Sequence, residues 1–336
     1  MQNSSDHHFC EASDGARICL SVIYSLLSVS GTLSNLLVIY LAYAFKKLRT
    51  TSNAFIINGC VADLLACALW MPQEALLIAQ RISVSHIYMA CTEGLLFLWI
   101  TVSLVSHSLI AVNRYILITK APTTYQAVYQ KRHTECMISL SWVIPSAVMV
   151  PWLVAQSSTE IYPKCVPLKH TDVLRRDTVV YSSYTTVFTI FTQTIIILYC
   201  YFKIFRKVQV SVKRVSVLNF QIINNLPYSL PRKDKRLRGY VLAVCWVFLL
   251  TTQPVMWVVF VGFFRSVPEA LVTVSWLFFS LLMVFNPFLY TWKNEEFRKS
   301  FKALLKGDAW KNSAIGVEPG LHTISQNVSW SAREQQ

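Results

Sequence analysis

The chain has 336 residues, of which 54% are hydrophobic and 14% charged, and its 31 Lys and Arg outnumber its 17 Asp and Glu to give a net charge of +14. Soluble domains carry about 25% charged residues, so this composition excludes an ordinary soluble or disordered protein. The positive charge alone would also fit a nucleic-acid-binding protein, but here basic clusters alternate with long apolar runs, which indicates a membrane protein.

Seven apolar runs are long enough to cross a bilayer as helices, at residues 18–45, 54–79, 88–118, 136–154, 179–204, 239–264 and 268–292. A hydrocarbon core of about 30 Å needs about 20 helical residues, and only helices or closed barrels can satisfy their backbone groups in lipid. We therefore predict an all-α fold, a seven-transmembrane helix bundle.

The basic residues beside these runs predict the orientation, because cytoplasmic loops carry the excess of Lys and Arg. They cluster after the first run, before the fourth, and between the fifth and the sixth. We therefore expect a multi-pass plasma-membrane protein with an extracellular N-terminus and a cytoplasmic C-terminus. The sequon Asn3-Ser4-Ser5 then lies on the lumenal side, where Asn3 is a candidate glycosylation site.

The cysteines divide between the spans and the outer side. Those inside spans are expected to be small buried apolar residues. The four on the outer side are Cys10, Cys19, Cys91 and Cys165. Three pairings are open to them in an oxidising compartment. We favour a disulfide between Cys91 and Cys165, which would tie the third span to the loop after the fourth and leave Cys10 and Cys19 to pair or remain free.

Three polar residues fall where polar residues are expensive, namely Asn35, Asp63 and Asn286 in the first, second and seventh spans. An ionised side chain near the bilayer centre costs about 2.5 to 3.5 kcal/mol on insertion scales, so each needs a reason. They could meet inside the bundle. A polar knot that holds helices together and a functional switch explain such a cluster equally well.

Arg114 lies near the cytoplasmic end of the third span and shares a helical face with Ser103 and His107. A lone Arg at a helix end often snorkels to the headgroups, and a mid-stripe His is more often a core residue than a proton switch. Pro254 and Pro287 interrupt the sixth and seventh spans, and each removes a backbone hydrogen bond and kinks its helix. Such kinks serve packing or a rigid-body switch.

Six motifs occur in order, one in each of six spans. They are Asn35, Val61-Ala62-Asp63-Leu64, Asn113-Arg114-Tyr115, Trp142, Pro254 and Asn286-Pro287-Phe288-Leu289-Tyr290. Together they resemble the signature set of rhodopsin-like (class A) G-protein-coupled receptors, over residues 18–305 and including a short amphipathic eighth helix at 294–305. Stretches at 51–56, 69–75, 211–220 and 290–298 resemble a brain orphan receptor of this family. The remaining parts would be an extracellular tail at 1–17 and a disordered cytoplasmic tail at 306–336.

The resemblance implies a receptor, not an enzyme, that catalyses nucleotide exchange on a heterotrimeric G protein of the inhibitory Gi/o family, with arrestin as a further partner and without a cofactor or metal. The residues that match the family's coupling and activation switch are Asn113, Arg114, Tyr115, Tyr201, Asp234, Asn286, Pro287 and Tyr290. Those that match the polar core are Asn35, Asp63, Ser103 and His107, and those of the transmission region are Gln193, Phe248, Thr252 and Pro254.

Several positions depart from the family pattern. Asn113 replaces the usual Asp before the Arg, Thr252 the usual Trp before the sixth-span proline, and His107 an aliphatic residue. Because these positions restrain related receptors, we predict measurable signalling without a ligand, with Asp234 as the remaining partner for Arg114. Leu282 and Met283 replace polar residues of a sodium cage, which disfavours a bound sodium ion.

The ligand is not fixed by these patterns. Leu96 stands where aminergic receptors carry an acid, and residues 268–291 contain no Lys for retinal. Candidate pocket residues are Glu74, Glu93, Tyr184, Thr185, Trp257 and Trp276. Aromatic residues near span ends are also typical interfacial anchors.

A small transporter or channel is the alternative function, and an intramembrane enzyme a third. Transporters show repeated halves with broken helices, which this chain lacks. The sequence contains neither His-Glu-x-x-His nor Gly-x-Ser-x-Gly, so no familiar reacting centre is present.

Overall fold

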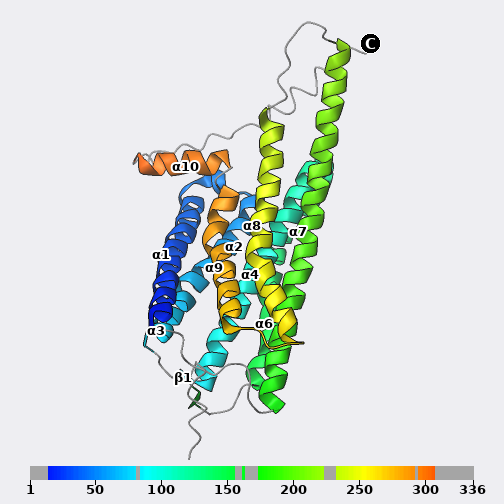
Figure 1. Cartoon of the computed structure of the whole chain (residues 1–336). Coiled ribbons are helices and arrows are strands. Elements are labelled where there is room, and N and C mark those ends of the chain that lie inside the picture. The colour runs from blue at the N-terminus through cyan, green and yellow to red at the C-terminus, as the bar shows by residue number, and fades with distance from the viewer. Residues whose placement is uncertain are drawn as a thin grey trace, which may run out of the picture.

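The computed structural model describes residues 14–80, 84–155, 161–162, 173–222, 232–291 and 294–306. Within these ranges the long helices lie side by side in one bundle (Figure 1). They are α1 (Asp14–Ala44), the continuous second helix made of α2 (Thr51–Leu65), η3 (Ala66–Trp70) and α3 (Met71–Gln80), α4 (His86–Thr119), α6 (Lys131–Ala155), α7 (Val173–Ile222), α8 (Arg232–Gly262) and α9 (Glu269–Thr291). The predicted helix-bundle fold is confirmed, and most helix ends lie within a few residues of the predicted spans.

Short elements occupy the two ends of the bundle. At one end are η2 (Lys46–Leu48), α5 (Pro122–Val128) and α10 (Glu295–Leu305), which lies across the bundle in Figure 1 and is the expected eighth helix. At the other end, β1 (Val84–Ser85) and β2 (Ile161–Tyr162) pair antiparallel, with Val84 opposite Tyr162. This two-residue ladder joins the loop after α3 to the loop after α6.

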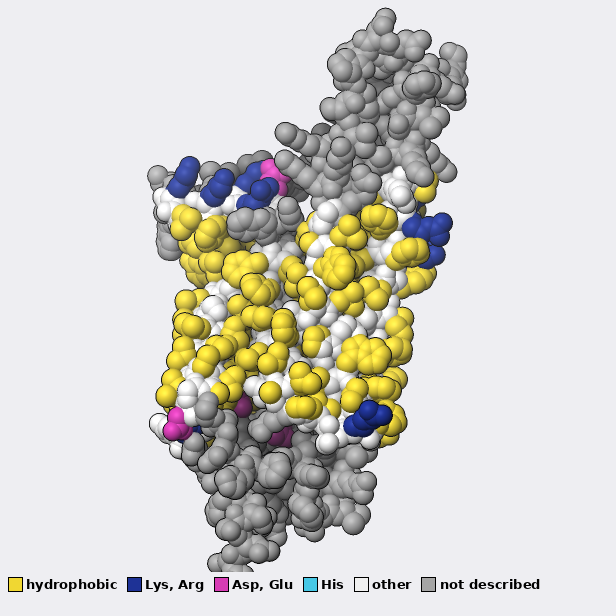
Figure 2. All heavy atoms as spheres, in the orientation of Figure 1, with side chains coloured by type: hydrophobic (Ala, Val, Ile, Leu, Met, Phe, Trp, Pro, Cys, Tyr) yellow, Lys and Arg dark blue, Asp and Glu magenta, His cyan; other side chains and the backbone are white. Residues whose placement is uncertain are grey.

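An apolar band covers the middle of the visible face of the bundle, and charged side chains gather at the two ends of the bundle (Figure 2). By length and composition six described helices can cross a membrane, at Asp14–Ala44, Thr51–Gln80, Ala90–Thr119, Ser183–Val210, Gly239–Gly262 and Ala270–Leu289. Helix α6 packs against α2, α4 and α7 within the same bundle, but its first turns carry Lys131, Arg132, His133 and Glu135. Exposed Leu, Val, Phe and Trp side chains on the band are those expected to face lipid.

The second helix contains a π-helical turn at Ala66–Trp70, just before Pro72. Proline has no N–H, so the carbonyl of Cys67, five residues earlier, loses its partner in this turn. Ser28 of α1 donates its Oγ–H to that carbonyl at 2.8 Å, and Ser21 donates to the carbonyl of Ala75 at 2.9 Å. Gly31 lets the two helices come this close. Helix α1 therefore completes the backbone hydrogen bonding of its irregular neighbour.

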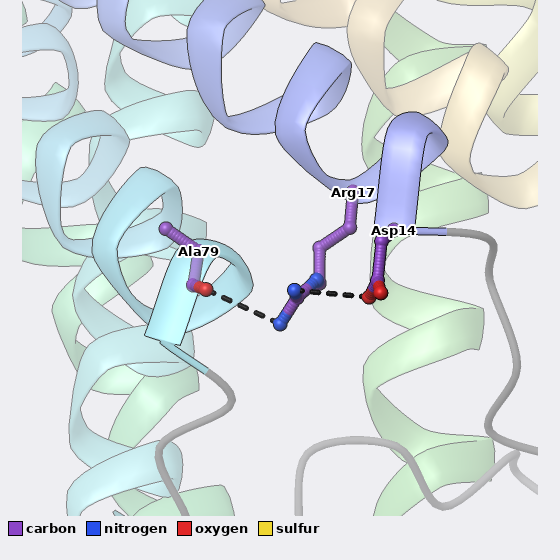
Figure 3. A network of polar contacts seen from close by, with 3 residues as sticks. All are labelled: Asp14, Arg17 and Ala79. Carbon is purple, nitrogen blue, oxygen red and sulfur yellow. Dashed lines mark hydrogen bonds and ion pairs between the residues drawn. The ribbon is translucent and has the colours of Figure 1, made fainter.

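The same pair of helices is also joined at the N-terminal end of α1, as Figure 3 shows. Arg17 donates from Nη1 to the carbonyl of Ala79 at 3.2 Å and from Nη2 to Asp14 Oδ1 at 3.1 Å. The carbonyl of Ala79 belongs to the last turn of α3, where helical carbonyls lack partners within the helix. Arg17 therefore caps α3, and its positive charge suits the negative end of the helix dipole.

Gly31→Ala should lower the thermal unfolding temperature of the detergent-solubilised protein. A Cβ at position 31 would collide with Sγ of Cys67 and lie 3.1 Å from its Cβ and 3.2 Å from Val284 Cγ2. Overpacking of this kind costs about 1 to 3 kcal/mol. The control is Gly15→Ala, where an added Cβ meets no atom within 4 Å. Cys67→Ala removes the colliding Sγ and should rescue Gly31→Ala in part, and an unchanged unfolding temperature in Gly31→Ala would contradict this packing.

Candidate functional site

A buried polar cluster joins the second, third and seventh spans near the middle of the bundle. Asn286 of α9 donates from Nδ2 to Asp63 Oδ2 of α2 at 2.6 Å, and the same nitrogen lies 3.4 Å from Ser103 Oγ of α4. Asp63, Ser103 and Asn286 are all buried. A carboxyl group that costs several kcal/mol in lipid is thus paired inside the bundle, as the sequence pattern predicted.

A small cavity lies beside this cluster. It offers about 10 Å³ to the centre of a water molecule, and its lining includes Asp63, Ser103, His107 and Asn286. This is about the space that one water needs. Oδ1 of Asp63 and Oδ1 of Asn286 are buried and accept no protein hydrogen bond, so the site presents acceptors for a donor such as water.

Asn35 belongs to a neighbouring contact. Its Nδ2 donates to the carbonyl of Gly31 at 2.9 Å and to that of Met283 in α9 at 3.0 Å. Met283 stands four residues before Pro287, so its carbonyl is the one that the proline leaves without a helical partner. Asn35 therefore supplies the hydrogen bond that the Met283 carbonyl lacks within α9. No direct hydrogen bond between Asn35 and Asp63 is found among the described residues.

A second polar network joins α2, α4 and α6 around Asn58. Trp142 donates from Nε1 to Asn58 Oδ1 at 2.9 Å. Nδ2 of Asn58 donates to Ser106 Oγ at 2.8 Å and to Ser141 Oγ at 3.1 Å. Sequence reasoning singled out Trp142 but missed Asn58, although an amide inside the second span was a readable signal.

Arg114 lies near the C-terminal end of α4, against the first turns of the α8 span. Its Cζ is 4.8 Å from the centroid of the Tyr240 ring, which places the guanidinium over an aromatic face. Tyr201 of α7 is buried beside this contact. Sequence reasoning expected Asp234 as the partner and missed Tyr240. The side chains of Asp234 and Tyr290 lie outside the described residues.

Asn113 points away from Arg114 and toward two neighbouring elements. Its Oδ1 accepts a hydrogen bond from Ser52 Oγ of α2 at 2.6 Å, and its Nδ2 donates to Tyr125 OH of α5 at 3.3 Å. Asn113 thus holds α5, which the sequence analysis did not predict, against α4 and α2. The Tyr125 ring in turn packs on Tyr129, with centroids 5.0 Å apart.

The predicted transmission residues lie along α7 and α8. The Phe248 ring meets His107 edge to face at 6.0 Å. The buried hydroxyl of Thr252 donates to the carbonyl of Phe248 at 2.7 Å, within its own helix. Pro254 lies inside α8, and the neighbouring Gln253 donates to Thr194 Oγ1 of α7 at 3.0 Å. Oε1 of Gln193 is buried without a hydrogen-bond partner.

The predicted ligand pocket is not assembled as expected. Trp257 is 57% exposed and Tyr184 60% exposed, so both lie on the outer surface, where Tyr184 stacks on Phe263 with centroids 4.5 Å apart. Trp276 packs against Phe279, and Glu93 is exposed. The half-buried Glu74 and Thr185 come from α3 and α7. The aromatic cup was therefore a wrong prediction, because Tyr184 and Trp257 face away from the bundle axis.

The predicted Cys91 to Cys165 disulfide stays a prediction, because Cys165 lies outside the described residues. Cys91 itself is an exposed free thiol near the start of α4. Among the residues that the structure describes, no group of three or more His, Cys, Asp or Glu is suited to hold a metal ion.

Comparison with known proteins assigns this arrangement to a group of receptors. Residues 34–290 match the family described as 7 transmembrane receptor (rhodopsin family). The chain is 24% identical to the adenosine receptor A3 of Bos taurus, over 92% of this chain and 95% of that receptor. It is 25% identical to the melatonin receptor type 1A of Mus musculus, over 85% of this chain and 80% of that receptor. It is 30% identical to the G-protein coupled receptor moody of Drosophila melanogaster, over 61% of this chain. The matched part spans 31% of that relative's length.

Asn58→Leu should destabilise the protein by about 1 to 3 kcal/mol, because it leaves the half-buried Trp142 Nε1 donor and the buried Ser106 hydroxyl without their amide partner. Thermal unfolding in detergent measures the change. Trp142→Phe removes the same donor but keeps most of the ring, so adding it to Asn58→Leu should cost less than it does alone. The exposed Ser139→Ala on α6 is the control. Strictly additive losses would show that the two side chains do not interact.

Proposed function

The chain belongs to the rhodopsin family of seven-transmembrane receptors, and we propose that it transmits a signal across the plasma membrane by catalysing nucleotide exchange on a heterotrimeric G protein. In this proposal the N-terminus is extracellular, and the end that carries α5, α10 and Arg114 faces the cytosol. The excess of basic residues at that end supports the orientation. The family match leaves the transporter or channel alternative without support.

The observation that carries the proposal is the Arg114 to Tyr240 contact at the cytoplasmic end. It joins α4 to the N-terminal end of the α8 span with a cation over a ring. An exposed cation–π contact is worth about 0.5 to 1 kcal/mol, rising to about 2 when it is desolvated. Outward movement of α8 would break it and free Arg114 to receive a helix of the G protein. Tyr201, buried beside this contact, and Tyr290, named by the family resemblance, are proposed to support the open form.

Ligand-independent activity is proposed from three positions, Asn113, Thr252 and His107, that depart from the family pattern. A receptor that rests at a ratio of active to inactive molecules of 1:99 needs about 2.7 kcal/mol in favour of the inactive state. Moving it from 1:99 to 99:1 takes about twice that free energy. Asn113 is committed to Ser52 and Tyr125, and Thr252 bonds within its own helix, so neither adds an ion pair or a large ring across the interface. His107 meets Phe248 at the place where an aliphatic seal is usual. We therefore propose measurable basal signalling.

The finer assignment rests on resemblance. The four stretches that resemble a brain orphan receptor support coupling to inhibitory Gi/o proteins, with arrestin as a second cytoplasmic partner. Gi/o coupling predicts faster guanine-nucleotide exchange on a purified inhibitory α subunit than on a stimulatory one when each is mixed with receptor in nanodiscs. Equal or reversed preference would remove the Gi/o assignment and leave the receptor proposal standing.

Arg114→Ala should abolish nucleotide exchange while surface expression stays near that of the unchanged chain, because Arg114 would contact the G protein directly. Exchange is measured with a non-hydrolysable GTP analogue on membranes of matched receptor content. Arg49→Ala, which removes a cation from the same end of the bundle at an exposed position, is the control and should couple normally. Full coupling by Arg114→Ala would overturn the role given to this residue.

Tyr240→Leu should raise basal activity, because it removes the ring that holds Arg114 and keeps an apolar side chain. Loss of about 0.5 to 2 kcal/mol shifts the resting equilibrium about two- to thirtyfold. Tyr240→Phe keeps the ring and should remain close to the unchanged chain. Forskolin-stimulated cyclic AMP, measured against receptor density without ligand, reports the difference. Equal basal activity in the Leu and Phe variants would mean that the ring does not restrain α8.

A further inference from the structure

A stripe of aromatic and basic side chains runs along one face of α7, near the cytoplasmic end of its membrane span Ser183–Val210. Tyr199, Phe202, Lys203 and Arg206 stand at steps of three and four residues, so they share a helical face. Nζ of Lys203 lies 5.4 Å from the centroid of the Tyr199 ring, and Cζ of Arg206 lies 5.8 Å from that of Phe202. Tyr199 and Phe202 are each more than half exposed. Aromatic side chains thus lie beneath positive charges on the outer surface.

Helix α4 contributes a matching half. The Tyr115 ring meets the Tyr199 ring edge to face at 6.1 Å, which joins the stripe to the end of α4. Lys120, directly after the last residue of α4, places its Nζ 6.0 Å from the Tyr115 ring. Three cations therefore lie over the rings of Tyr115, Tyr199 and Phe202, two of which are in contact with each other.

These charges are not neutralised within the described part of the chain. The described ion pairs of this end involve Lys131 with Glu135 and Lys299 with Glu295 and Glu296, and none includes Lys120, Lys203 or Arg206. Glu135 of the neighbouring α6 lies 3.9 Å from Lys131. The positive potential of the stripe is thus available to an external anion.

The depth of the stripe indicates where that anion would come from. Lys203 and Arg206 lie within the apolar span Ser183–Val210, and Lys120 directly follows the span Ala90–Thr119. Figure 2 shows basic side chains over α7 at the edge of the apolar band. Lys and Arg at this depth extend toward the headgroup layer, and Tyr and Trp rings prefer the same layer. A soluble peptide would have to displace lipid to reach exposed rings at this height.

We propose that Lys120, Lys203 and Arg206, on the ring platform of Tyr115, Tyr199 and Phe202, form a binding site for the phosphorylated headgroup of an anionic phospholipid in the cytoplasmic leaflet. The cations pair with the phosphates, and the rings contact the glycerol and upper acyl region. A headgroup held there bridges α4, which carries Arg114, and α7, which carries Tyr201. The leaflet rests on the orientation proposed above, but lipid binding at this site does not require the contact of Arg114 with the G protein.

Binding is tested with the full chain in phosphatidylcholine nanodiscs that contain about 5% fluorescent phosphatidylinositol 4,5-bisphosphate, read by energy transfer from a label on the receptor. The test variant replaces Lys120, Lys203 and Arg206 by Gln. Each basic residue near an anionic surface is worth about fivefold in affinity, so the triple variant should bind about a hundredfold more weakly. Replacing Lys120 and Lys203 by Arg keeps the charge and should preserve binding.

The matched control replaces Lys46, Lys47 and Lys302 by Gln, which removes the same charge from exposed positions on η2 and α10. It should keep most of the binding, and equal losses in the two triple variants would show diffuse attraction and overturn the site. Equal unfolding temperatures in pure phosphatidylcholine confirm that both variants fold. Soluble inositol 1,4,5-trisphosphate should compete poorly, and equally tight binding of this soluble headgroup would mean that the site is not a lipid site.

Discussion

A bilayer offers no water to buried polar groups, so the hydrogen bond of 2.6 Å between Asp63 and Asn286 is the contact on which the bundle is organised. Two backbone carbonyls that prolines leave without a helical partner also receive a hydrogen bond from a side chain of a neighbouring helix. Asn35 takes the carbonyl that Pro287 leaves free, and Ser28 takes the one that Pro72 leaves free. Helices α1, α2 and α9 are thereby fixed to one another through their backbones.

Helix α8 is held differently. Besides the apolar side chains that it packs against α7 and α9, its described polar and ring contacts include an edge-to-face contact of Phe248 with His107, a hydrogen bond from Gln253 to Thr194, and the Arg114 to Tyr240 contact. None of these satisfies a backbone group or pairs two charges. Because an equilibrium can be shifted only by contacts that differ between its states, we propose that the Arg114 to Tyr240 contact is one that breaks when α8 moves.

Much of this was predictable from the sequence because membrane spans and buried charges have few solutions. Hydropathy placed the helices, and the cost of burying Asp63 predicted that polar residues would gather around it. The failures concern side-chain direction. Trp257 and Tyr184 were read as pocket residues but face outward. The contact of Arg114 with Tyr240 was not foreseen, because a charge is easier to read from a sequence than a ring at the right height. The expected Asp234 contact stays a prediction. Helix α5 escaped notice because its seven residues carry no periodic pattern.

The central claim is that the cytoplasmic end opens by movement of α8 away from α4. The most direct measurement uses pulsed electron paramagnetic resonance in nanodiscs to determine the distance between spin labels at Leu117 of α4 and Leu242 of α8. Both side chains are exposed in the structure. The account predicts a longer distance when nucleotide-free G protein is added, and a partial shift to that distance in Tyr240→Leu alone. An unchanged distance distribution on G-protein binding would contradict it.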